Sequence, residues 1–178
     1  MTQATTLSPA LNPEQQEGES FDAYLDRITI YTEYHGFTNN QLDPQKTELL
    51  AELNAVYGSN RAHRQAALLR GLLKAMSKED PQLISVSMEY EGSGDSGQIE
   101  AISIDRLQET SPLKDHLHLN SILDFICWDI AYGTHPGFEI NDGGRGELSC
   151  EKQEDGTWTI ELDHKEYYTQ TNDFSTEF

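Results

Sequence analysis

Apolar side chains recur at helical spacing in three successive segments near the start of the chain. In the first segment Phe21, Tyr24, Leu25 and Ile28 lie three or four residues apart, and similar stripes follow Pro44 and continue to about residue 78. Proline at the first position of a helix is a common start signal. The pattern predicts three helices within residues 20–79.

After this region the period changes from helical to alternating. Ile84, Val86, Met88 and Tyr90 alternate with polar residues, which is typical of a half-buried strand. A second strand is expected over 98–105, an apolar helix over 118–132, and strands near 147–152 and 157–164. The Asp155-Gly156 pair between the last two strands is a strong hairpin signal. The order predicts an α+β fold: N-terminal helices followed by a ββαββ unit with antiparallel strands.

Composition divides the chain into four segments. Residues 1–19 are polar and predict a disordered arm, 20–79 a helical segment, 80–168 an acidic α+β domain, and 169–178 a frayed tail. Cys127 and Cys150 are expected to be small buried side chains.

Acidity is concentrated in the second half. The 178 residues include 31 Asp and Glu against 12 Lys and Arg, a formal net charge of −19, and residues 80–178 alone carry a net −16. This sign disfavours nucleic-acid binding through a basic face. No apolar run approaches the roughly 20 residues of a membrane-spanning helix. The first ten residues lack the features of a secretory signal, so a cytoplasmic location is expected.

Topology predicts where a site would form. If both hairpins are antiparallel and the helix returns the chain, then the loops 92–97 and 133–146 and the end of the last strand meet at one end of the sheet. The residues expected along this rim are Asp95, Glu100, Asn141, Asp142, Glu147, His164 and Glu166. Strand parity adds that Glu100, with Ile102, and His164, with Leu162, point to the core side.

The rim chemistry leaves several kinds of binding open. Carboxylates with Asn and Gly can hold Ca²⁺ or Mg²⁺ through oxygen ligands, with Asp95, Glu100, Asp142 and Glu166 as the candidate metal ligands. Glycine-rich loops can present backbone N–H groups to an anion, with help from Arg145. The candidate binding residues therefore are the rim residues together with Ser96, Gln98 and Arg145. The six histidines show no zinc-site spacing, and His135 is interpreted as a loop residue that ends the helix.

Three motifs carry a resemblance to a known family. Their sequences are YEGSGDSGQIE at residues 90–100, HPGFEINDGGRG at 135–146, and LDHKEYYT at 162–169. With them, residues 84–169 resemble a family of small acidic bacterial proteins of unknown function. The resemblance implies that the three segments belong together, and it assigns no activity.

Three functions are compatible with these patterns. The favoured one is a non-catalytic acidic interaction protein that docks on a basic protein surface, in its sharper form a nucleic-acid mimic or an inhibitor of a defence complex. The second is a divalent-metal-dependent enzyme or metal-binding module that uses the rim carboxylates, with His164 as acid or base. The third is a subunit of a larger assembly in which helices 20–78 dock on a neighbour.

Overall fold

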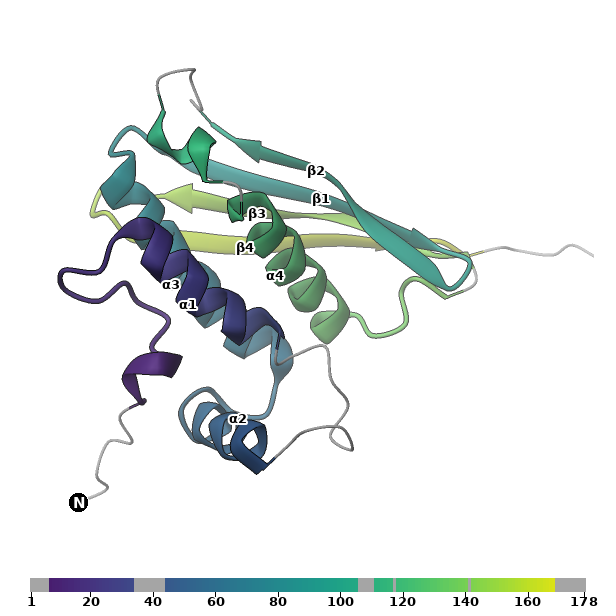
Figure 1. Ribbon diagram of the computed structural model, residues 1–178. Coiled ribbons are helices and arrows are strands. Elements are labelled where there is room, and N and C mark those ends of the chain that lie inside the picture. Colours follow the sequence, from purple (N-terminus) through teal and green to yellow (C-terminus); the bar gives the residue numbers. More distant parts are fainter. Residues whose placement is uncertain (1–6, 34–43, 106–110, 117, 141, 169–178) are drawn as a thin grey trace, which may run out of the picture.

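The computed structural model has two layers, a four-stranded sheet and a set of helices on one of its faces (Figure 1). It describes residues 7–33, 44–105, 111–116, 118–140 and 142–168. The helices are α1 (Phe21–Glu33), α2 (Pro44–Tyr57), α3 (Arg61–Glu79) and α4 (Leu119–Thr134), and the 3₁₀ turns are η1 (Pro9–Leu11) and η2 (Pro112–Asp115). The strands are β1 (Ser85–Ser93), β2 (Ser96–Ile104), β3 (Gly144–Lys152) and β4 (Trp158–Glu166). The predicted α+β class and element order are confirmed.

All strand pairs of the sheet are antiparallel, in the order β2-β1-β3-β4. The hairpins β1–β2 and β3–β4 are the two that the sequence predicts. They are joined along β1 and β3, where Val86 lies opposite Cys150 and Met88 opposite Leu148. This seam makes β1 a central strand although it is the first strand in the sequence.

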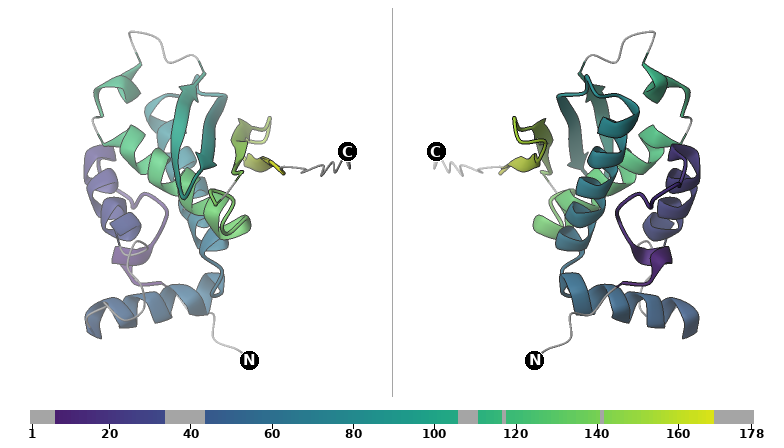
Figure 2. Two further views of the ribbon diagram at one scale, coloured as in Figure 1. Left: turned by 90° about the vertical axis from the view of Figure 1, so that its right-hand side faces the viewer. Right: turned by 90° about the vertical axis from the view of Figure 1, so that its left-hand side faces the viewer.

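The core lies between the sheet and the helices. α4 packs against the sheet on one side and against α1 and α3 on the other, which explains why apolar residues occupy so much of its circumference. One continuous hydrophobic cluster includes Leu72 of α3, Ile126 of α4 and Met88 of β1. Cys127 and Cys150 are fully buried in it, as expected. α2 lies beneath α3 at the end of the molecule away from the sheet (Figure 2).

The prediction that Glu100 points to the core is wrong because β2 contains a bulge. Glu89 lies opposite Ala101 and Tyr90 opposite Ile99, so Glu100 is the extra residue between the two pairs. The bulge lets Ile99 and Ile102 both contact the core although three positions separate them. Glu100 is consequently exposed.

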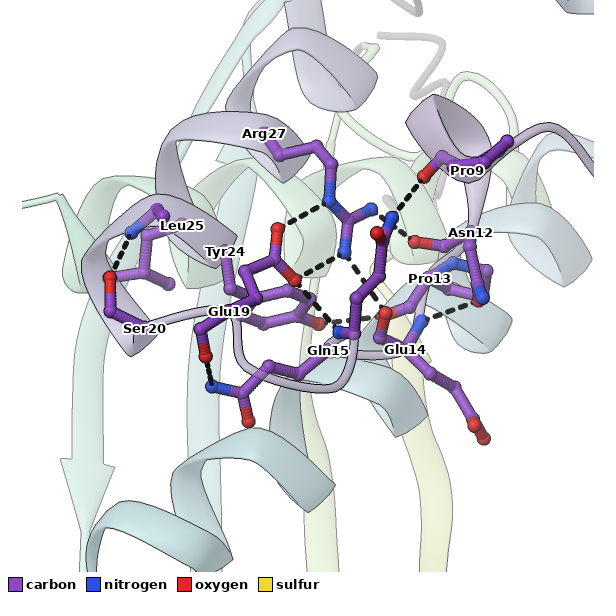
Figure 3. A network of polar contacts seen from close by, with 12 residues as sticks. Pro9, Asn12, Pro13, Glu14, Gln15, Glu19, Ser20, Tyr24, Leu25 and Arg27 are labelled. Carbon is purple, nitrogen blue, oxygen red and sulfur yellow. Dashed lines mark hydrogen bonds and ion pairs between the residues drawn. The ribbon is translucent and has the colours of Figure 1, made fainter.

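Residues 7–19 form an ordered segment, which we call the N-terminal strap, where the sequence predicts a disordered arm. Leu11 is buried, and the Tyr24 hydroxyl donates to the Pro13 carbonyl at 2.8 Å. Arg27 of α1 donates hydrogen bonds to the carbonyls of Asn12 and Glu14 and to the Glu19 carboxylate (Figure 3). The polar composition of residues 7–19 does not predict this order, because most of these hydrogen bonds are accepted by backbone carbonyls of the strap, which every residue type provides.

The predicted disorder of residues 1–6 and fraying of residues 169–178 concern the two ends of the chain. Residues 1–6 and the predicted frayed tail, 169–178, lie outside the described residues. Within the described ranges, no helix has the length and apolar character needed to cross a bilayer.

Candidate functional site

The loops of the three motifs meet at one end of the sheet, as the topology predicts. Gly92 of β1 lies opposite Gly144 of β3, which in turn lies opposite Glu166 of β4. The Asp95 N–H in the β1–β2 turn donates to the Glu139 carbonyl at 3.0 Å. We call this part of the molecule the glycine-rich end.

Glycine allows the chains to approach closely at this end. Gly143 has a φ of +83°, and a Cβ atom there would lie 2.0 Å from the carbonyl oxygen of Gly92. Both facts exclude other residue types without a backbone shift. The Gly143-Gly144 pair therefore turns the chain into β3 directly against the end of β1.

The structure divides the candidate residues between the two faces of the sheet. His164 lies on the helix side, and Asp142 and Glu166 line a surface hollow of about 310 Å³ beside it. Glu100, Arg145 and Glu147 line a different hollow, of about 260 Å³, on the side away from the helices. Ser96 and Gln98 line a third with Glu100, Asp95 lies in the adjoining turn, and Asn141 lies outside the described residues.

The predicted metal ligands are separated by this division. Asp142 and Glu166 line one hollow, whereas Glu100 lines the two hollows that do not include them. The Glu100 carboxylate accepts a hydrogen bond from Gln98 at 2.9 Å. Among the described residues, Asp95, Glu100, Asp142 and Glu166 do not form a common ligand cluster. The expected convergence holds for the backbone loops but not for these side chains, because neighbouring strand positions point to opposite faces.

On the helix side, a glycine lies between a tyrosine and a histidine. Gly146 of β3 is opposite both Tyr90 of β1 and His164 of β4. Side chains two strands apart are separated by about 10 Å at their backbones. Because Gly146 has no side chain, the Tyr90 hydroxyl reaches across it to His164 Nδ1 at 2.8 Å.

Aromatic rings surround the His164 imidazole. The His135 ring, at the C-cap of α4, stacks on it with centroids 4.0 Å apart, and Phe138 meets it edge-on at 5.2 Å. Only 4 % of the His164 side chain is exposed. Burial, and after it the electrostatic effect of the neighbouring His135, lowers the pKa of His164. Its Nε2 atom is buried and has no hydrogen-bond partner in the part of the chain that the structure describes.

The opposite face of the sheet has no described helix over it (Figures 1 and 2), and we call it the open face. Its side chains alternate with those of the core along β1, β3 and β4. Glu89, Glu147 and Asp163 lie directly opposite one another on β1, β3 and β4, and we call these three residues the acidic row. The other acidic residues of this face are Glu91, Glu100, Glu151 and Glu161.

Few cations balance these charges. Arg145 and Lys165 lie opposite each other in the register next to the acidic row. Lys165 Nζ lies 3.9 Å from the Asp163 carboxylate, with both side chains largely exposed. Within the described part of the chain, no ion pair forms with the carboxylates of Glu89 or Glu147. The open face is thus strongly acidic with a small cationic edge at the glycine-rich end.

Sequence reasoning missed several residues that the structure brings into these sites. Tyr90 and His135 lie within the quoted motifs, but their contact with His164 depends on strand pairing that one sequence does not specify. Glu89 and Asp163 could have been found by applying the alternating pattern to the polar face as well as the apolar face of each strand.

The comparison with protein families gives one match. A model for a family of unknown function (DUF6878) matches residues 103–178. This fits the resemblance to a family without an assigned activity, and the matched range contains the second and third motifs but not the first. No curated protein and no solved structure matches the chain.

Proposed function

We propose that this protein is a non-catalytic interaction protein whose open face docks on a basic surface of a partner protein. The observation that supports this proposal is the acidic row, in which three carboxylates from three strands are aligned on a face that no described helix covers.

Such an alignment is unfavourable in the isolated chain. Directly opposed side chains on neighbouring strands have Cβ atoms about 5 Å apart, and like charges at this separation destabilise the sheet. Lysine or arginine side chains from a partner would relieve this repulsion on binding. A surface that only had to be soluble would not require carboxylates in register on adjacent strands.

The charge pattern also favours a particular kind of partner. A basic patch would cover the acidic row, and an acidic group at its edge would pair with Arg145 and Lys165. Complementary charge of this kind raises the association rate and selects the orientation of docking. A nucleic-acid-binding protein offers such a basic patch, so the narrower form of the proposal is a mimic that occupies a nucleic-acid site.

Site-specific crosslinking tests which face is used. Ala101 is exposed and lies directly opposite Glu89, so a photo-crosslinking residue there reports on the open face. Ala55 is exposed on α2, far from the sheet, and serves as the control position. In the cells that naturally produce the protein, we expect a defined crosslinked partner from position 101 and not from 55. Crosslinking from 55 alone would contradict the proposal.

Neutral variants test whether the acidic row supplies the binding energy. The open-face triple variant, Glu89→Gln with Glu147→Gln and Asp163→Asn, keeps side-chain size and removes three charges. The matched control triple removes three exposed charges elsewhere: Glu17→Gln, Asp26→Asn and Glu154→Gln. With the crosslinked partner purified, affinity should fall at least tenfold in the first variant and much less in the control. Equal losses would mean that only net charge matters. For a mimic, duplex DNA or RNA should compete for the same partner.

A further inference from the structure

Three metal-ligating side chains lie together on the helix side of the glycine-rich end. His135, His164 and Glu166 each offer one ligand atom, and these atoms lie within 4.8 Å of one another. They come from three places: the C-cap of α4, the interior of β4 and its last residue. His164 Nε2 lies 3.8 Å from Glu166 Oε1.

A second observation, independent of this clustering, points to a ligand. The His164 side chain is 96 % buried, yet its Nε2 atom has no hydrogen-bond partner among the described residues. Buried polar atoms are almost always hydrogen-bonded, and an exception in a folded protein calls for an explanation. The Glu166 carboxylate lies 3.8 Å from this nitrogen, and the His135 ring stacks on the face of the same imidazole.

The strand next to this nitrogen carries a glycine. Gly144 is opposite Glu166 in the register, and a Cβ atom at Gly144 would lie only 3.2 Å from His164 Nε2. Any other residue there would press on the imidazole. Glycine at this position therefore places no side chain against the nitrogen from the strand side.

Tyr90 fixes the other side of the ring. In proteins that bind metals through histidine, the second ring nitrogen usually carries its proton toward an acceptor that orients the ring. The Tyr90 oxygen, 2.8 Å from His164 Nδ1, can accept that proton because a hydroxyl is both donor and acceptor. Nε2 would then present its lone pair. A neutral imidazole is the form that binds metals.

We propose that His135, His164 and Glu166 form a binding site for a divalent transition metal of the zinc class, with Tyr90 as the positioning residue. Two imidazoles and one carboxylate suit Zn²⁺ or Co²⁺ better than Ca²⁺ or Mg²⁺, which prefer oxygen ligands. Three protein ligands leave a fourth position for water or for a ligand that enters from the hollow lined by Glu166 and Asp142.

Binding requires a small local adjustment. Ligand atoms around a tetrahedral zinc ion are about 3.3 Å apart, given bonds of about 2.0 Å. The His135 ring and the Glu166 carboxylate must therefore turn toward the side of His164 on which Nε2 lies. His135 follows the last turn of α4 and Glu166 ends β4, so both can move, whereas Tyr90 and Phe138 hold the ring of His164.

Metal titration of the full chain tests the site. After treatment with EDTA, the protein is titrated with Co²⁺ in excess Mg²⁺, which occupies non-specific carboxylate sites. We expect one equivalent to bind with the intense visible bands of four-coordinate Co²⁺, Zn²⁺ to displace it, and saturating Zn²⁺ to raise the melting temperature. The absence of saturable binding would overturn the proposal.

Variants assign the ligands. His135→Asn, His164→Gln and Glu166→Gln should each weaken Co²⁺ binding at least tenfold, and Tyr90→Phe should weaken it about 10–100-fold while the visible bands remain. Glu166 is exposed, so its variant tests the site without disturbing the core. His63→Asn, at an exposed position of α3, is the matched control and should bind normally. Unchanged binding in both the His164 and Glu166 variants would contradict the assignment.

Discussion

Glu19 in the N-terminal strap forms a two-pronged ion pair with Arg27 of α1. Arg27 Nε lies 2.8 Å from Oε1 and Nη2 lies 2.9 Å from Oε2, and both side chains are 14 % exposed. The hydrogen bonds from Arg27 lower the pKa of Glu19 below its ordinary value of 4.5. Because the folded state favours the ionised carboxylate, this contribution to stability is present above pH 4.5 and is lost as the pH falls through the lowered pKa.

The strap therefore predicts an acid-sensitive difference between variants. At neutral pH, Glu19→Gln should melt at a lower temperature than the native chain, and the gap should close as the pH is lowered below 4.5. Calorimetry over a pH series measures this gap, with the exposed Glu17→Gln as the control. A gap that persists unchanged in acid would show that charge is not its cause.

Asp129 of α4 is the most deeply buried carboxylate among the described residues. Its side chain is 1 % exposed and accepts hydrogen bonds from Arg61 Nε at 2.8 Å and Gln65 Nε2 at 2.9 Å. Burial raises its pKa although both partners oppose this shift. Arg61, by contrast, is 32 % exposed and can reach water on its own.

This asymmetry predicts unequal effects of removing either partner. Arg61→Met leaves a buried carboxylate without its cation and should lower the free energy of unfolding by about 3–5 kcal/mol. Asp129→Ala leaves mainly the Gln65 amide unsatisfied and should cost about 1–3 kcal/mol. Urea unfolding measures both, and the reverse order would contradict this account of the pair.

At the scale of elements, β3 depends on Gly146 for its place between β1 and β4. A Cβ atom at this position would lie 2.4 Å from the Tyr90 hydroxyl and 2.2 Å from the Asp163 carbonyl. Gly146→Ala should therefore destabilise the fold by about 1–3 kcal/mol. Ser149→Ala on the open face of the same strand is the control and should have little effect. Equal stability of the two variants in urea would show that the strands adjust freely.

Particular elements show what the sequence does and does not predict. The apolar period of α4 and the alternation along β4 predict both elements, and they correctly place His164 on the core face. The bulge at Glu100 escapes prediction because alternation assumes an unbroken pleat, and one extra residue reverses the faces beyond it. The contact between His135 and His164 cannot be predicted from the sequence either, because it depends on how the end of α4 packs over β4.

At the scale of the whole molecule, repulsion between the exposed acidic side chains lowers the stability of the folded state. Screening by salt weakens repulsion between exposed like charges. We therefore expect added NaCl to raise the melting temperature of the native chain. The open-face triple variant should be more stable at low salt, on the order of 1 kcal/mol, and should respond less to NaCl. The control triple should respond more nearly as the native chain does. If the melting temperatures of the open-face triple variant and the control triple respond identically to NaCl, the acidic row is not the main source of the repulsion.

The strand order has a consequence for how the chain folds. Each hairpin joins neighbours in the sequence, but the seam between β1 and β3 joins strands separated by β2, α4 and their connections. Contacts between distant parts of a chain form slowly because a long loop must first close. The two hairpins should consequently form early and the seam late. The Tyr90–His164 contact spans this seam, so it forms only when the last long-range step of folding is complete.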